Sequence, residues 1–177
     1  MVSENDDWFC VANVLLKSLD ELITIYHDTV GNNGVLEMDF AIDTTGNVHP
    51  NQAAQYKALG DTIRNCYSTP IASTNAILNG TANTTLQLSL PLHTYDVLDR
   101  VIVQEDIQYG QRVRHFSIEV DGQGVANWTS VGHKKILLFE KVFTDVTSVA
   151  LVIDQFVGDA VFISNFAAFK PCANVNL

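Results

Sequence analysis

Apolar residues recur with two different spacings along this chain, and the change falls near residue 68. In the first part, Ser18 and Glu21 have the spacing of a capping box, so we expect a helix to begin there. Its apolar stripe has helical spacing and consists of Leu15, Leu19, Leu22, Ile23, Tyr26 and Val30. The Gly and Asn residues at 31–34 adopt positive φ angles easily and should end the helix.

A strand and a second helix are expected next. Residues 35–42 alternate apolar with polar side chains, which is the pattern of a strand. The chain then turns at residues 44–47, and Pro50 suits the first turn of a helix. The apolar stripe of this helix consists of Ala53, Tyr56, Leu59 and Ile63. The order helix, strand, helix is typical of a piece of an α/β architecture.

After a polar stretch at residues 68–85, the pattern changes to short strands with no helical segment between them. The predicted strands cover residues 86–90, 97–104, 116–120, 135–139, 148–153 and 160–169. Six short strands bounded by turn residues favour an antiparallel sandwich. We therefore predict an α+β, mainly β chain with a helix–strand–helix segment (1–67), a linker (68–85) and a β-sandwich (86–177).

Composition narrows the classes of function. The chain has 177 residues, 47% of them hydrophobic, so it is long enough to bury one core. Its formal net charge of −10 disfavours nucleic acid and anionic membranes as partners, because both bind clustered Lys and Arg. No apolar run is long enough to span a membrane, and residues 1–7 lack the apolar core of a signal peptide. The histidines show no metal-ligand spacing and no phosphate loop follows a strand, so we expect neither a metal nor a cofactor.

The cysteines and glycosylation triplets leave two questions open. Cys10, Cys66 and Cys172 are too far apart for a zinc motif. A Cys66–Cys172 disulfide and buried free thiols are both compatible with the spacing, and Cys10 would be left over. Asn-x-Ser/Thr triplets begin at Asn79, Asn83 and Asn127. They predict surface glycosylation and favour a secreted or lysosomal parent protein, although the chain itself shows no signal peptide.

Several segments resemble the α-L-fucosidases of glycoside hydrolase family 29. Residues 26–33, Tyr-His-Asp-Thr-Val-Gly-Asn-Asn, are similar to the turn before the family's last barrel strand. Residues 43–50, Asp-Thr-Thr-Gly-Asn-Val-His-Pro, are similar to the segment after that strand. Gly-Gln-Arg-Val at 110–113 and Val-Gly-His-Lys-Lys at 131–135 are similar to the family's carboxy-terminal sandwich. The resemblance covers residues 8–169 and implies the last units of a (β/α) barrel joined to a jelly-roll, galactose-binding-like sandwich.

The resemblance also implies a parent enzyme that removes terminal α-L-fucose from glycans with retention of configuration. The family's nucleophile lies in a Trp-x-Asp-Gly context, with an acid/base Glu further along, and neither region is found in this sequence. Trp8 and Phe9 match a stretch that helps to line the fucose pocket, although Cys10 departs from the family pattern. The chain alone is therefore expected to be non-catalytic. Its expected partners are a fucosylated glycan, and a second chain that completes the barrel or another copy of itself.

The predicted strand at 35–42 departs from the family in its polar face, which carries Glu37, Asp39 and Asp43. A barrel strand covered on both faces would be nearly all apolar. Two of these carboxylates have about the spacing that glycoside hydrolysis needs, but a solvated face is the simpler explanation. Because an isolated strand exposes its edges, we expect it to pair with the sandwich, a second copy or another partner.

A second hypothesis is a stand-alone carbohydrate-binding or protein-interaction sandwich. The aromatic side chains available to contact a sugar would then be Tyr95, Tyr109 and Trp128. Only an analogy between folds supports this function at the level of sequence.

Overall fold

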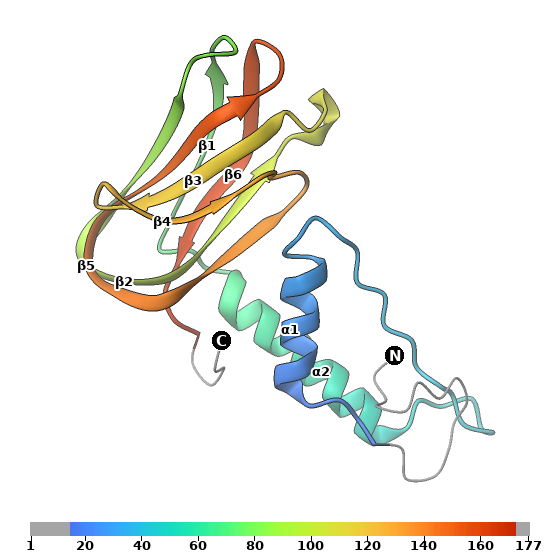
Figure 1. The fold of residues 1–177 in the computed structure, drawn as a ribbon. Coiled ribbons are helices and arrows are strands. Elements are labelled where there is room, and N and C mark those ends of the chain that lie inside the picture. The colour runs from blue at the N-terminus through green and yellow to red at the C-terminus, as the bar shows by residue number, and fades with distance from the viewer. Residues whose placement is uncertain (1–14, 173–177) are drawn as a thin grey trace.

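A computed structural model describes residues 15–172, apart from the side chains of Thr94 and Tyr95. Two helices lie side by side at one end of a β-sandwich (Figure 1). The helices are α1 (Leu19–Thr29) and α2 (Pro50–Tyr67), with a short 3-10 helix η1 (Ile107–Tyr109). The strands are β1 (Ala72–Asn79), β2 (Leu86–Glu105), β3 (Val113–Val120), β4 (Gln123–Trp128), β5 (Lys135–Phe156) and β6 (Ala160–Phe169). The predicted α+β, mainly β fold is confirmed.

Two long strands, β2 and β5, belong to both layers of the sandwich. The strand order is β1-β6-β2-β5-β3-β4, and every pair is antiparallel. Residues 86–91 of β2 pair with 148–153 of β5, whereas 100–103 pair with 135–138. The register breaks between these stretches, where both strands bend around one end of the sandwich (Figure 1). β3 and β4 extend the first layer, and β1 and β6 extend the second.

The hydrophobic core lies between the two layers. It is built from alternate residues of the strands, as the period of two in the sequence predicts. Its fully buried members include Leu98, Val101, Val103, Val113, Phe116, Ile118, Leu151, Ile153 and Phe166. Each such side chain stabilises the fold by about 1.5–3 kcal/mol relative to an exposed position, so the core is the main stabilising feature of the sandwich.

All six predicted strands lie within observed ones, and 160–169 coincides with β6. The stretch 68–85, predicted to be a linker, instead contains β1, which pairs with β6 from Ala72↔Ala168 to Asn79↔Ala160. The linker was inferred from polar composition, but polar residues of β1 occupy its solvent-facing positions. This stretch is therefore part of the sandwich, and the division into domains stays a prediction.

Both helices form where the sequence predicts them. The capping box is present, because Glu21 N donates to Ser18 Oγ at 3.2 Å and Ser18 N donates to Glu21 Oε2 at 2.7 Å. Pro50 occupies the first turn of α2, where its missing N–H costs no hydrogen bond. Leu22, Ile23 and Leu59 form a small core between the helices.

The predicted strand at 35–42 is wrong. Residues 34–41 run extended beside the helices without a strand partner in the described part of the chain, and an isolated bridge joins Ile42 to Val48. The alternation itself persists: Leu36 and Met38 are partly buried against the helices, whereas Glu37 is exposed. A ladder also needs a neighbouring strand, and the sandwich does not supply one here. Pairing with a second copy or another partner stays a prediction.

A polar cluster joins the helices to the sandwich. The Arg100 side chain on β2 is fully buried and donates to Asp99 Oδ1 at 2.7 Å and to the Cys66 carbonyl at 3.0 Å. Its guanidinium lies 5.0 Å from the ring centroid of Tyr67. His27 Nε2 lies 2.5 Å from the Tyr67 hydroxyl oxygen, so α1 and α2 are tied together at the same place. Burial, followed by the nearby positive charge of Arg100, lowers the pKa of His27 to about 4.

We expect the His27 environment to make the chain less stable in acid. Folding lowers the pKa of His27 from 6.5 to about 4. Between these two pH values the unfolded chain binds a proton at His27 that the folded chain does not bind. The free energy of unfolding should therefore fall as the pH falls from 6.5 to 4. The His27 share should be about 1–2 kcal/mol, less than the full shift would give, because the ring is only half-buried and solvent screens it.

Urea unfolding at neutral pH and near pH 4 measures this loss. His27→Gln should lose less stability than the wild type over the same interval. His133→Gln, at an exposed position, should match the wild type. Carboxyl groups titrate in all three proteins, so the difference between variants isolates His27. An equal loss in His27→Gln and the wild type would contradict the assignment.

Candidate functional site

A groove lies between the extended segment 34–41 and the two helices. It has a volume of about 500 Å³. Its apolar lining comes from three elements and consists of Tyr26, Val30, Leu36, Met38, Leu59 and Ile63. Lys57 and Arg64 also line the groove. They donate hydrogen bonds to Asp61 at 2.5 Å and 2.6 Å, and these hold the pKa of the Asp61 carboxyl below its usual value. The groove is suited to packing against an apolar surface.

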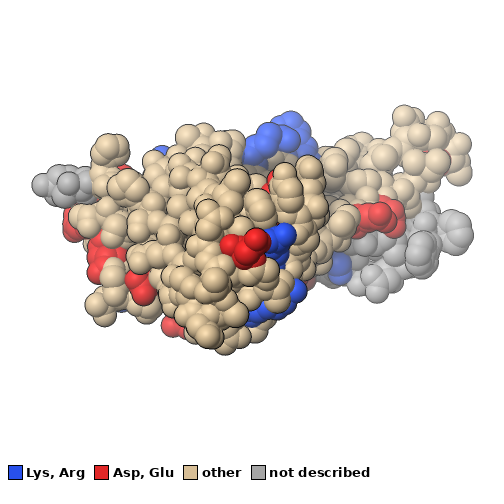
Figure 2. All heavy atoms as spheres, turned by 90° about the horizontal axis from the view of Figure 1, so that it is seen from above, with Lys and Arg blue, Asp and Glu red and all other residues tan. Residues whose placement is uncertain are grey.

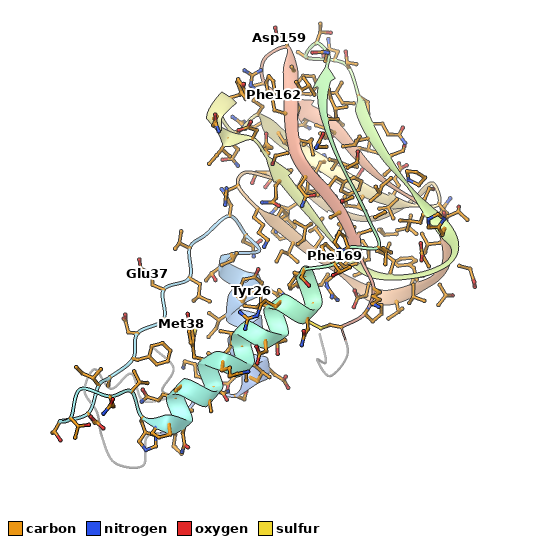
Figure 3. All side chains as sticks on the ribbon, turned by 180° about the vertical axis from the view of Figure 1, so that it is seen from behind. Tyr26, Glu37, Met38, Asp159, Phe162 and Phe169 are labelled. Carbon is orange, nitrogen blue, oxygen red and sulfur yellow. A yellow bond between two sulfur atoms is a disulfide. The ribbon has the colours of Figure 1, made fainter. Side chains whose placement is uncertain are left out.

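The carboxylates considered from the sequence do not face this groove. Glu37 and Asp39 are exposed, and Figure 3 shows Glu37 on the outer side of the extended segment, away from the helices. Asp43 is engaged in a turn, where its Oδ1 accepts from Thr45 Oγ1 at 2.6 Å and from Asn47 N at 3.0 Å. These hydrogen bonds lower the pKa of Asp43. None of these three carboxylates lines the groove, so the groove lacks the pair of carboxylates that glycoside hydrolysis requires.

The other candidate residues that the structure describes do not line the groove. Trp8, Phe9 and Cys10 fall outside the described residues. The three glycosylation triplets begin at exposed positions on β1, on the loop that follows it and on β4: Asn79, Asn83 and Asn127. Of the aromatic residues proposed to contact a sugar, Tyr109 is 55% exposed and Trp128 is 47% exposed.

The sulfurs of Cys66 and Cys172 are bonded in the structure, with 5.1 Å between the Cα atoms. This is one of the two arrangements that the sequence left open. The bond joins the last turn of α2 to the segment that follows β6. It therefore reinforces the junction formed by Arg100.

Within residues 15–172, no group of three or more His, Cys, Asp or Glu side chains could hold a metal ion. No helix among these residues is long and apolar enough to cross a membrane. Figure 2 shows Lys and Arg in separate small groups on the face seen from above, rather than as a continuous basic surface.

Solved structures show what this chain is similar to. No protein-family model matches it, and no curated protein matches it. A protein from Bacteroides thetaiotaomicron assigned as an α-L-fucosidase is 30% identical, with a TM-score of 0.78 over 88% of this chain and 35% of its own. One from Bacteroides ovatus with the same assignment is 24% identical, with a TM-score of 0.86 over 99% of this chain and 30% of its own. A Ruminococcus gnavus family 29 fucosidase in complex with fucose is 16% identical, with a TM-score of 0.83 over 97% of this chain and 40% of its own.

The match covers nearly all of this chain and well under half of each of these proteins. The three structures align with 88–99% of this chain. The predicted resemblance is confirmed: the chain is similar in fold to the α-L-fucosidases of glycoside hydrolase family 29, as expected for their carboxy-terminal portion.

Proposed function

We propose that these 177 residues form a non-catalytic part of an α-L-fucosidase, in which they complete a barrel that another part of the enzyme supplies. The observation that carries this proposal is the match itself, which spans 97–99% of this chain but only 30–40% of the Bacteroides ovatus and Ruminococcus gnavus proteins. The complete enzyme would hydrolyse terminal α-linked L-fucose with retention of configuration.

The extended segment supports this proposal. Its backbone at residues 34–41 has no ladder partner among the described residues. Val35 within it is 83% exposed, and Ile42 directly after it is 61% exposed. Exposed apolar side chains beside unpaired backbone groups favour the addition of a strand. The alternating side chains are already oriented for a sheet, so a neighbouring strand would turn the segment into the barrel strand that the sequence predicts.

The chain alone should show no fucosidase activity. Hydrolysis needs a proton donor and a nucleophile within reach of the same bond, and Glu37 and Asp39 face solvent without a pocket between them. The test is release of 4-nitrophenol from its α-L-fucoside between about pH 4 and about pH 8. Glu37→Gln and Asp39→Asn should match the wild type at the buffer rate. Turnover that either substitution abolishes would show that this chain has catalytic carboxylates of its own.

Activity should appear when the missing barrel is supplied. A suitable partner is the part of the Bacteroides thetaiotaomicron relative that this chain does not cover. Asp39→Pro should reduce the restored activity at least tenfold, because proline removes the N–H that a new ladder would use. In the isolated chain the Asp39 N–H makes no hydrogen bond among the described residues, so the thermal midpoint should stay unchanged.

Asp39→Ala is the matched control, since it removes the same carboxylate and keeps the N–H. It should retain the restored activity. Equal activity of Asp39→Pro and Asp39→Ala in a working complex would contradict strand pairing by this segment.

A further inference from the structure

A pocket of about 320 Å³ lies where the loop after α1 meets the end of β4 and the start of β5. Its polar and aromatic lining consists of Asp28, Asn32, Asn33, Trp128, Ser130 and Lys135. We propose that this pocket binds one pyranose unit of a neutral glycan, with Trp128 as the stacking surface. The site goes beyond the proposed function and does not depend on it.

The pocket and the groove use opposite sides of α1. Tyr26 and Val30 are four residues apart and share the side that lines the groove. Asp28 lies midway between them in sequence, so it projects from the other side of the helix and lines the pocket. A barrel that packs against the groove would therefore approach a different surface.

Backbone hydrogen bonds fix the floor of the pocket before any ligand binds. Asn33 N donates to the Lys134 carbonyl at 3.0 Å, and Ile136 N donates to the Gly31 carbonyl at 2.9 Å. The Asn33 side-chain oxygen accepts from His133 N at 2.6 Å. Gly132 permits this close approach, since a Cβ there would lie 2.5 Å from Asn33 Nδ2. A prearranged site loses little conformational entropy on binding.

Trp128 provides an aromatic surface held in place from one side. Lys135 Nζ lies 3.4 Å from the centroid of its ring and donates to Asn32 Oδ1, and the lysine is almost fully buried. The ammonium lies over one face of the indole, and the residue as a whole remains 47% exposed, which leaves aromatic surface for a ligand. The C–H groups on one side of a pyranose ring pack well against such an electron-rich surface.

Three polar groups beside the indole are free to bind hydroxyls. The Asp28 carboxylate, the Ser130 hydroxyl and the Asn33 amide nitrogen make no hydrogen bond within residues 15–172. The carboxylate accepts hydrogen bonds, the serine hydroxyl both donates and accepts, and the amide nitrogen donates. Sugar hydroxyls can bind all three, because each hydroxyl both donates and accepts. Burial lowers the pKa of Lys135 to about 8, so its charge largely persists at neutral pH and balances that of Asp28. A pocket in which positive and negative charge cancel favours a neutral sugar over an anionic one.

The test uses the full chain labelled with ¹⁵N-tryptophan and follows the indole N–H resonances. The sequence has two tryptophans, so Trp8→Phe assigns the Trp128 signal. The probes are methyl α-L-fucopyranoside and methyl β-D-galactopyranoside, with glycerol as a polyol that lacks a ring face. We expect one or both glycosides to shift the Trp128 resonance saturably, with a Kd of about 1 mM, and glycerol to leave it unchanged.

Asp28→Asn keeps the shape of the side chain and should weaken binding about tenfold, and Ser130→Ala should weaken it several-fold. Tyr109→Ala is the matched control, because this exposed aromatic residue stacks on Phe162 with ring centroids 4.3 Å apart and lies outside the pocket. It should bind as the wild type does. Thermal midpoints establish that each variant is folded.

The absence of any Trp128 shift up to about 50 mM glycoside would overturn the proposal. Equal affinity of the wild type and the folded Asp28→Asn and Ser130→Ala variants would also overturn it. Failure of barrel complementation would bear only on the proposed function, because this titration needs no partner chain and no catalysis.

Discussion

Arg100 lies within β2 with none of its side chain exposed, and a charge in that position is tolerated only when it is paired. Asp99 supplies the opposite charge, and the carbonyl of Cys66 supplies the acceptor on α2. Withdrawing the helix would remove the Cys66 carbonyl from the guanidinium, at a cost of about 1.5–3 kcal/mol for a hydrogen bond to a charged group. The helices therefore keep their position at the end of the sandwich. The groove includes residues of both helices, and the Trp128 pocket includes Asp28 at the end of α1, which packs against α2.

A second buried charge lies at the carboxy-terminal end of β2. Glu105 is almost fully buried, and its carboxylate accepts backbone N–H groups from Arg112 at 2.8 Å, Val113 at 3.1 Å and Gly132 at 2.8 Å. Three backbone donors replace the water that a carboxylate would otherwise bind. The loop that leads into β3 and the loop before β5 are thus fixed to one side chain. Since Gly132 also contacts Asn33, this carboxylate helps to place the floor of the Trp128 pocket.

Local signals in the sequence predicted much of this fold, and they failed where the outcome depended on distant neighbours. The capping pair at Ser18 and Glu21 and the apolar alternation at residues 116–120 carry their own structural information, and both predictions are confirmed. Residues 35–42 alternate as a strand should, yet a ladder requires a second strand that no local pattern guarantees. β1 was missed because the polar residues on its exposed face resemble a linker. The Trp128 pocket combines residues that lie about a hundred positions apart in the sequence. Its segments carry the family resemblance, but no local pattern in them indicates that they contact each other.

The bond between Cys66 and Cys172 spans 106 positions, and all six strands lie between its two ends. Tension applied to the chain on either side of the sandwich would therefore pass through the sulfur atoms and bypass the sheets. A protease that cut any one loop between the strands would likewise release no piece, because the flanking segments would stay covalently joined. The sandwich is in this sense a closed ring inserted into the polypeptide, protected from pulling and from a single cut by the same covalent bond.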